Sequence, residues 1–318
     1  MTYSRIIGTG SYLPERVMMN AELEDMIDTS DEWIQVRTGI KQRHIAAENE
    51  TTCDMSEHAA VNALNAADIS TDSLDLIVLA TSTPDMIFPS TACLLQDRLG
   101  IHNGCPAFDI QAVCSGFIYA LSVADSFIRN GESRRALVVG ADTNSKIMDW
   151  TDRGTCVIFG DGAGAVVLES SEEPGIYSTH IHADGAYADL LYVPGGASKP
   201  DDKPYMKMSG NEVFKIAVRT LNDIIEEALV ANNLTTQDID WLVPHQANIR
   251  IIAATAKKLG LPMDRVALTI AEHGNTSGGS IPLTLDTAIR AGDIKRGETL
   301  VMEAFGGGFT WGSALIKY

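Results

Sequence analysis

One cysteine in this 318-residue sequence stands where the backbone can activate a thiol. Residues 107–113 have the pattern of a strand that runs directly into Cys114, and a helix is expected to begin at Ser115. The positive end of a helix dipole stabilises a thiolate, so we expect a lowered pKa and a nucleophilic role for Cys114. A buried, inert thiol is the alternative interpretation. The other cysteines lack this setting and are interpreted as structural: Cys53, Cys93, Cys105 and Cys156.

A histidine and an asparagine occupy matching places in the second half of the chain. An internal repeat with an offset of 165 aligns His245 with Ala80 at the end of a strand, and an offset of 161 aligns Asn275 with Cys114. A duplicated fold brings equivalent strand ends to one cleft, so we expect these groups to share a site. The second half would then supply an imidazole and a carboxamide where the first half supplies a thiol and an alanine.

The repeat that positions these residues rests on three matches in the same order. The matched pairs are 63–78 with 228–243, 125–131 with 286–292, and 135–139 with 298–302. Each pair joins a helix end or a short apolar strand to its counterpart. We therefore predict two related α/β halves, residues 1–170 and 171–318, that pack against each other without a linker.

Strands alternate with helices in both halves. Strands are predicted at 6–7, 76–80, 107–113, 136–140, 163–169, 181, 242–243, 266–270, 299–304 and 313–317. Helices are predicted at 22–28, 55–67, 115–130, 209–232, 248–259 and 283–291. Residues 195–205, rich in Pro, Asp and Lys, are expected to form an exposed loop.

Composition excludes several classes of function. The chain is 45% hydrophobic and 21% charged, with a formal net charge of −18, so nucleic acid and an anionic membrane surface would repel it. Its five cysteines show no C-x-x-C spacing, which favours neither a disulfide framework nor a zinc site. With no signal-peptide pattern and no long apolar run, we expect a cytoplasmic enzyme.

Two glycine-rich segments, 159–164 and 306–308, do not match a nucleotide-binding loop, because neither has the required spacing or a following Lys-Ser/Thr. Glycine also allows backbone N–H groups to approach a ligand closely. For residues 306–308, which follow a predicted strand, we therefore favour an oxyanion hole.

These motifs resemble those of the β-ketoacyl-acyl-carrier-protein synthase III family. The resemblance rests on segments 113–116, 244–248, 273–277 and 303–312, and it extends over the whole chain through 8–14, 29–34, 37–40, 151–154 and 159–164. It implies a thiolase-like α/β fold, with two pseudo-symmetric α/β halves in a layered α-β-α-β-α architecture. It also implies the reaction that starts bacterial type II fatty acid synthesis.

The resemblance assigns a role to each matching residue. Cys114 would be the acyl-accepting nucleophile, with His245 and Asn275 as its partners, and the N–H groups of Cys114 and Gly307 would form the oxyanion hole. The residues implied for coenzyme A and acyl binding are Trp33, Arg37, Arg153, Gly210, Asn248, Phe305 and Phe88. Phe88 would close the acyl pocket across a homodimer interface. Acyl-CoA is a substrate in this scheme, and no metal or redox cofactor is required.

A basic surface is expected to bind acyl carrier protein, a strongly acidic partner. Its candidate residues are Lys215, Gln246, Ala247, Asn248, Ile249, Arg250, Lys257 and Lys258. A local basic patch on an acidic protein steers an acidic partner. Two departures from the family pattern are Gly278-Gly279, where alanines are usual, and Trp150, which replaces a frequent proline.

Other functions remain alternatives at this level. Residues 306–312 contain no cysteine, which disfavours a degradative thiolase, and Asn275 replaces the second histidine of an elongating synthase. A synthase of secondary metabolism with the same Cys-His-Asn set and another acyl-CoA starter is the main alternative. An inactive scaffold that holds acyl carrier protein is disfavoured by the complete set. Acetyl is the default starter.

Overall fold

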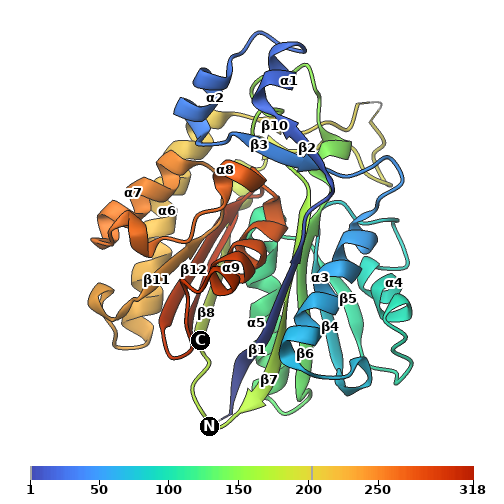
Figure 1. Ribbon diagram of the computed structural model, residues 1–318, viewed down its shortest axis with the longest axis vertical. Coiled ribbons are helices and arrows are strands. Elements are labelled where there is room, and N and C mark those ends of the chain that lie inside the picture. Colours follow the sequence, from blue (N-terminus) through green and yellow to red (C-terminus); the bar gives the residue numbers. More distant parts are fainter. Residues whose placement is uncertain (1, 202) are drawn as a thin grey trace.

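The computed structural model describes residues 2–201 and 203–318, and it has two main sheets and three layers of helices (Figure 1). Two short strand pairs lie outside these sheets: β2 (Arg16–Met19) with β3 (Gln42–Ile45), and β9 (Leu191–Tyr192) with β10 (Lys207–Met208). The first sheet has the order β1-β7-β6-β4-β5 and the second β11-β12-β13-β8. The strands are β1 (Tyr3–Tyr12), β4 (Leu76–Ala80), β5 (Ala107–Ile110), β6 (Arg135–Asp142), β7 (Gly162–Ser171), β8 (Ile176–Ala183), β11 (Trp241–Pro244), β12 (Thr299–Gly306) and β13 (Thr310–Lys317).

Helices cover both faces of each sheet. Helices α5 (Gly116–Arg129) and α9 (Ser280–Ala291) fill the middle layer, where they share one apolar core with the inner faces of both sheets. Helices α3 (Thr52–Ala67) and α4 (Thr91–Arg98) cover the first sheet, and α6 (Gly210–Ala231) and α7 (Ile249–Leu259) cover the second (Figure 1). The predicted α-β-α-β-α layering is confirmed.

The two sheets follow the same plan. Reading each from the strand beside the other sheet, β1-β7-β6-β4 corresponds to β8-β13-β12-β11. In each half a single turn of 3₁₀ helix precedes the middle-layer helix: η2 (Val113–Ser115) before α5 and η7 (Ser277–Gly279) before α9. Val113 and Ser277, the first residues of these turns, both have φ of 50°.

This correspondence corrects one sequence alignment. Since Val113 matches Ser277, the counterpart of Cys114 is Gly278, and the predicted equivalence of Cys114 with Asn275 is wrong by three residues. A difference in length accounts for two of these residues, because α5 has 14 residues and α9 has 12. The third is Asn130, which lies between α5 and Gly131, whereas Gly292 follows α9 directly. An offset measured near the ends of these helices is therefore not kept at their starts.

Other predicted elements differ in detail. Residues 266–270 do not form a strand, since Val266 makes only an isolated bridge to Leu242, residues 267–269 are irregular, and α8 (Ile270–His273) begins at Ile270. The first helix is α1 (Asn20–Glu24), shorter than the predicted 22–28. Helices α2 (Asp31–Thr38) and α4 were not predicted. The expected loop at 195–205 is exposed over its described residues, and Asp202 lies outside them.

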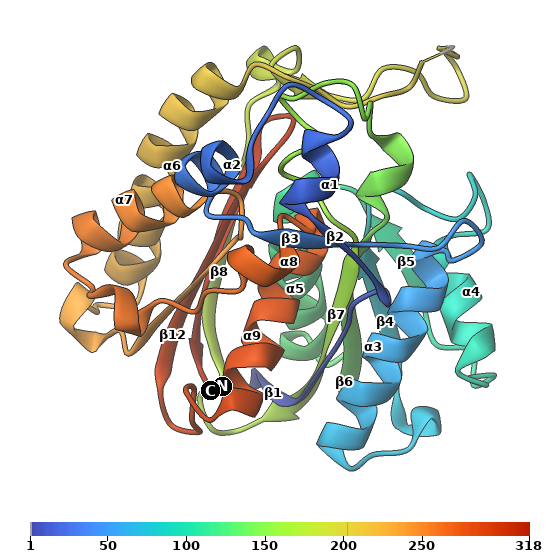
Figure 2. The same ribbon diagram turned by 45° about the horizontal axis from the view of Figure 1, so that its top comes forward.

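A small cap lies over one end of both sheets. It consists of β2 (Arg16–Met19), α1, α2 and β3 (Gln42–Ile45), which lie at the top of the molecule in Figure 1 and at its front in Figure 2. The buried guanidinium of Arg43 fastens it, donating to Met18 O, Asn20 Oδ1 and Val157 O at 3.3, 2.9 and 2.9 Å. Burial lowers the pKa of Arg43 to about 10. One residue therefore joins the cap to the segment that leads into Phe159.

The chain ends lie close together at the opposite side of the molecule from the cap (Figures 1 and 2). No helix in the described part of the chain combines the length and apolar character needed to cross a membrane.

Candidate active site

The catalytic residues predicted from the sequence lie near the ends of parallel strands. Strands β4, β5 and β6 run parallel, as do β11 and β12, so their carboxyl ends lie on one edge of each sheet. Cys114 follows β5, His245 follows β11, and Phe305 is the next-to-last residue of β12, where it pairs with Trp311. Asn275 joins them through a bridge to Phe159.

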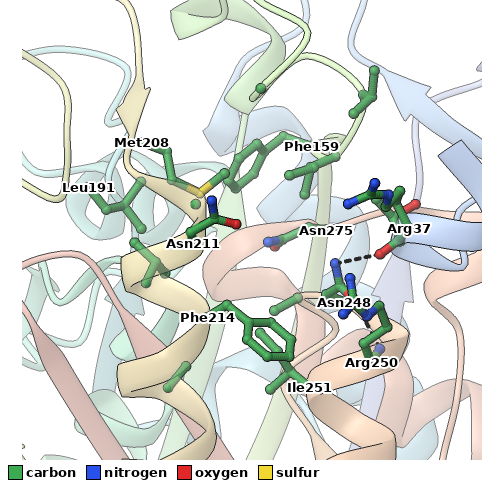
Figure 3. Close-up of a pocket in the computed structure, with 18 of the residues that line it drawn as sticks. Arg37, Phe159, Leu191, Met208, Asn211, Phe214, Asn248, Arg250, Ile251 and Asn275 are labelled. Atoms are coloured by element: carbon green, nitrogen blue, oxygen red, sulfur yellow. Dashed lines mark hydrogen bonds between the residues drawn. The ribbon is translucent and has the colours of Figure 1, made fainter. Parts of the chain in front are cut away.

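These residues line one cavity of about 360 Å³. Cys114, His245, Asn275 and Phe305 are each buried, at 4 to 6% exposure, so they form its inner end. The remaining predicted binding residues that line it are Trp33, Arg37, Arg153, Gly210 and Asn248. Figure 3 shows residues of α6 on one side of this cavity and Arg37, Asn248 and Arg250 on the other.

The thiol of Cys114 differs from expectation in its ionisation. Burial raises the pKa of Cys114 to about 12, and a hydrogen bond from Sγ to Ser277 Oγ, at 3.6 Å, offsets this only in part. The predicted lowering by the helix dipole is therefore wrong, because the loss of water around the thiol outweighs the effect of the helix end. Cys114 is held as a neutral thiol that must lose its proton when it reacts.

His245 is a neutral imidazole for the same reason. Burial lowers the pKa of His245 to about 3, and its Nδ1 has no hydrogen-bond partner among the described residues. Its backbone N–H donates to Glu303 O at 2.8 Å, which fixes the residue at the end of β11 beside β12. A neutral ring can offer one N–H donor to the cavity without adding charge.

The carboxamide of Asn275 is oriented by its neighbour. The N–H of Ser277 donates to Asn275 Oδ1 at 2.8 Å, so the amide nitrogen remains available as a donor. The Asn275 backbone is also fixed, because its N–H donates to Ile158 O and its carbonyl accepts from Gly160, at 3.0 and 2.9 Å. His245 and Asn275 can thus present two neutral donors near the thiol.

The glycine segment after β12 touches the nucleophile's backbone. A Cβ on Gly306 would lie 2.8 Å from Cys114 N and 3.3 Å from Cys114 Cβ. A larger residue at position 306 would therefore push the end of β12 away from the turn that carries Cys114. Gly307 is restrained from its other side, where a Cβ would lie 2.8 Å from Leu191 O. This close approach fits the expected backbone oxyanion hole.

At the cavity mouth, two guanidinium groups lie close to one indole ring. The guanidinium carbons of Arg37 and Arg153 lie 5.6 and 4.9 Å from the centre of the Trp33 ring. Arg153 also donates to Asp28 O at 2.8 Å, and Ser30 caps α2 by accepting from Trp33 N at 3.1 Å. An aromatic face flanked by guanidinium groups suits a planar base that carries phosphates.

Helix α7 starts at the same mouth. The Asn248 side chain accepts from Arg250 N at 2.9 Å and donates to Arg37 O at 3.0 Å, so it links the start of α7 to α2. The Arg250 guanidinium lies 5.3 Å from the centre of the Phe214 ring on α6. Lys215, Lys257 and Lys258 are exposed on the same two helices.

Two predicted site residues lie elsewhere. Gln246 is 1% exposed, and both ends of its side-chain amide are hydrogen-bonded. The amide nitrogen donates to Pro244 O and Ala267 O, and the amide oxygen accepts from Thr269 N and Ile270 N. Its assignment to a protein-docking surface is therefore wrong, and it instead holds the end of β11 against the segment that follows Val266. Phe88 is 82% exposed and does not line the cavity within this chain.

Comparison with known proteins identifies the family. The model of the 3-oxoacyl-[acyl-carrier-protein] synthase III family matches residues 108–185, and the model of its C-terminal part matches residues 229–318. The β-ketoacyl-[acyl-carrier-protein] synthase III of Alkalilimnicola ehrlichii is 62% identical, and the alignment covers 100% of both chains. The chain belongs to the 3-oxoacyl-[acyl-carrier-protein] synthase III family.

Solved structures agree with this membership. The synthase III of Aquifex aeolicus has a TM-score of 0.94 and 49% identity, covering 99% of this chain and all of the other. A priming β-ketosynthase of the R1128 polyketide pathway has the same TM-score at 36% identity, covering 99% of this chain and 96% of the other. As a member of the synthase III family, the chain is a condensing acyltransferase.

Sequence reasoning missed two buried groups beside the thiol. Ser277 belongs to the family motif 273–277, but its residue type alone did not predict a role for it. Asp142 is the last residue of β6 and lies next to Ser277. Asp142 is fully buried and accepts from Gly278 N at 2.9 Å. The available signal was its place at the carboxyl end of a central strand, where functional side chains collect.

Proposed function

We propose that this chain is a β-ketoacyl-acyl-carrier-protein synthase III, which transfers an acyl group from acyl-CoA to Cys114 and condenses it with malonyl carrier protein. The product is a 3-oxoacyl carrier protein, released with CO₂ and CoA. The observation that supports this most directly is one buried cavity with Cys114, His245 and Asn275 at its inner end and Trp33 close to two guanidinium groups at its mouth.

The loading step requires donors for an oxyanion. The Cys114 sulfur attacks the thioester carbonyl, and the N–H groups of Cys114 and Gly307 stabilise the tetrahedral oxyanion until CoA departs. Phe305, 6% exposed beside the thiol, helps to exclude water from the acyl-enzyme. A water-poor site protects the thioester from hydrolysis.

The condensing step requires donors for an enolate. Loss of CO₂ from the malonyl group leaves an enolate oxygen, to which His245 Nε2–H and Asn275 Nδ2–H donate. The enolate carbon then attacks the Cys114 thioester. Two neutral donors suit this intermediate, because a carboxylate at either position would repel it.

The acyl chain has a second, smaller cavity available. About 150 Å³ of space also borders Cys114, and the apolar residues that line it include Ile147, Phe159, Leu191 and Met206. This volume favours a short starter such as acetyl. The direct test measures turnover with malonyl carrier protein against a panel of acyl-CoA starters. Exclusive use of aromatic or long-chain starters would favour a secondary-metabolism synthase instead.

The nucleotide end of CoA gives a prediction for Trp33. Replacing it by alanine removes the ring that Arg37 and Arg153 flank, so we expect KM for acetyl-CoA to rise about tenfold or more, since stacking contributes at this scale. Acetyl-pantetheine, which lacks the nucleotide, is the matched substrate and should respond little. A similar loss with both substrates would assign Trp33 to folding of the cap.

The basic residues around the mouth give a prediction for carrier-protein binding. Arg250 lines the cavity, Lys257 lies two turns further along α7, and Lys258 is partly compensated by Asp223 at 3.9 Å. Arg250→Glu and Lys257→Glu should each weaken the carrier-protein step by an order of magnitude, and salt should mimic them. Acyl-CoA loading of Lys257→Glu is the control, and an equal fall in loading would exclude the patch as the docking site.

The buried imidazole gives a prediction for pH dependence. The pKa of His245 is lowered to about 3, so the ring stays neutral as pH falls from 7 through 6.5, the usual histidine pKa. We expect kcat/KM for malonyl carrier protein decarboxylation to show no ionisation near 6.5. Steady-state rates between pH 5 and about 8 test this. A midpoint near 6.5 that disappears in His245→Gln would contradict it.

A homodimer, cytoplasmic location and the absence of a cofactor complete the proposal. Met86, Ile87 and Phe88 form an exposed apolar segment, at 46, 77 and 82%, which supports an interface where Phe88 meets a second subunit. Five unpaired cysteines fit a reducing compartment. The steps above use CoA as a substrate and need no metal or redox group.

A further inference from the structure

The thiol proton of Cys114 is directed to a side chain that lies beside a buried carboxylate. Cys114 Sγ donates to Ser277 Oγ at 3.6 Å. The buried carboxylate of Asp142 lies beside Ser277, because it accepts from the N–H of the next residue, Gly278, at 2.9 Å, and the Ser277 side chain offsets part of the rise in its pKa. These groups come from three elements: η2 carries the thiol, η7 the hydroxyl, and the end of β6 the carboxylate.

Asp142 is surrounded by donors. Its Oδ1 accepts from Ser82 N at 2.7 Å and from the hydroxyls of Thr81 and Thr83 at 3.2 and 3.3 Å. Its Oδ2 accepts from Gly278 N at 2.9 Å. A carboxyl group with only donors around these oxygens is held as an acceptor, which is its ionised form. Burial raises the pKa of Asp142, so this carboxylate is a stronger base than an exposed one.

The backbone at Ser277 is also unusual. Its φ of 50° is rare for a residue with a side chain, and such conformations persist where the surroundings hold them. In this conformation Ser277 directs its N–H to Asn275 Oδ1 and its hydroxyl between Cys114 and Asp142. One residue therefore contacts both the nucleophile and a proposed enolate donor.

We propose that Ser277 and Asp142 form a proton-accepting pair that removes the Cys114 thiol proton during acyl loading. The inference rests on the proposed function, because it concerns the loading step. His245 is a poor alternative base, since burial lowers its pKa to about 3. Ser277 touches the reacting sulfur, and Asp142 acts through Ser277.

The proton balance of the step is closed. As the S–C bond to the acyl carbon forms, the S–H bond breaks and the proton passes to Ser277 Oγ, whose own proton passes to the Asp142 carboxylate. When the tetrahedral intermediate collapses, the C–S bond to CoA breaks. The proton then returns through Ser277 to the departing CoA thiolate, so Asp142 is ionised again before the malonyl group enters.

The test compares Ser277→Ala and Asp142→Asn with Ser115→Ala. Ser115 is the matched control, because its buried hydroxyl adjoins Cys114 in sequence but binds Ala112 O and Thr310 Oγ1. Two rates are measured: single-turnover acetyl loading from acetyl-CoA by quenched mass spectrometry, and alkylation of Cys114 by iodoacetamide as a function of pH.

We expect loading to fall roughly 10²-fold in Ser277→Ala and in Asp142→Asn. The alkylation midpoints should move in opposite directions. The pH midpoint of alkylation should rise in Ser277→Ala, because this variant loses a hydrogen bond that favours the thiolate. The midpoint should fall in Asp142→Asn, because this variant loses a nearby negative charge. Ser115→Ala should keep the wild-type midpoint. Other titratable groups nearby, His245 and the buried Glu303 of β12, are unchanged in every variant.

A structural or purely electrostatic role gives a different result. If Asp142→Asn loads at the wild-type rate or faster while its thiol titrates at lower pH, Asp142 accepts no proton and the proposal is wrong. Wild-type loading by Ser277→Ala overturns it equally, and this variant decides if Asp142→Asn does not fold. Failure of the wild-type protein to load any acyl-CoA would instead contradict the proposed function, and the alkylation shifts would still be readable.

Discussion

Cys114→Ser should lower acyl loading by roughly three orders of magnitude, because a hydroxyl ionises far less readily than a thiol and is a weaker nucleophile. The geometry makes the effect specific to this position. Cys114 is the cysteine at the inner end of the cavity, where Gly306 approaches its backbone. The measurement is the mass of each cysteine peptide after incubation with acetyl-CoA.

The control for this prediction is Cys93→Ser. Cys93 is an exposed thiol on α4, and its Sγ donates to Ala107 O rather than facing the cavity. Loading of Cys93→Ser should equal that of the wild-type protein. An acyl adduct on Cys53, Cys93, Cys105 or Cys156 would show that the nucleophile has been misassigned.

His245→Ala and Asn275→Ala should separate the two half-reactions. Each variant removes a donor to the enolate, and loss of one such donor costs about 10²–10³ in rate, so malonyl decarboxylation should fall by this factor. Loading should be much less affected, because the first oxyanion is assigned to the N–H groups of Cys114 and Gly307. Labelled CO₂ release and acyl-enzyme formation report the two steps separately.

A matched pair of variants sharpens this test. Asn275→Asp keeps the size of the side chain but places a negative charge beside the enolate, so its decarboxylation should be slower than that of Asn275→Ala. Gln246→Ala alters the neighbour of His245 without removing a cavity group, since Gln246 bonds only to backbone atoms in the described contacts. Equal collapse of loading and decarboxylation in folded His245→Ala would contradict the division of labour.

The sequence was most informative where a single local pattern, such as a run of apolar residues or the boundary between a strand and a helix, determines the structure. Strand β4 was predicted with its observed bounds, because five consecutive apolar residues lie between polar turns. The place of Cys114 between a strand and a helix was also predicted, but the strand does not run directly into it. Strand β5 ends at Ile110, the turn η2 covers Val113–Ser115, and α5 begins at Gly116. Helix α2 was missed although it carries Trp33, because eight largely polar residues give no clear apolar face.

Properties that depend on surroundings could not be obtained in this way. The thiol pKa depends on burial, which several elements create together, and a prediction from the helix dipole alone gave the wrong direction. Gln246 appeared to belong to a surface because its neighbours Asn248 and Arg250 do. Its burial depends on residues 267–270, which come near it only in the folded chain.

The repeated turn before α5 and α9 bears on the origin of the site's asymmetry. Two identical half-chains related by a dyad would carry the same residue at both turns, and any change would appear twice. Covalent fusion of the copies removes that constraint. Here one copy has a thiol at the second position of the turn and the other has Gly278, while Ser277 beside it reaches back to the thiol. Duplication thus supplied two equivalent turns. After divergence, one turn carries the reacting thiol and the other carries a hydroxyl that accepts a hydrogen bond from it.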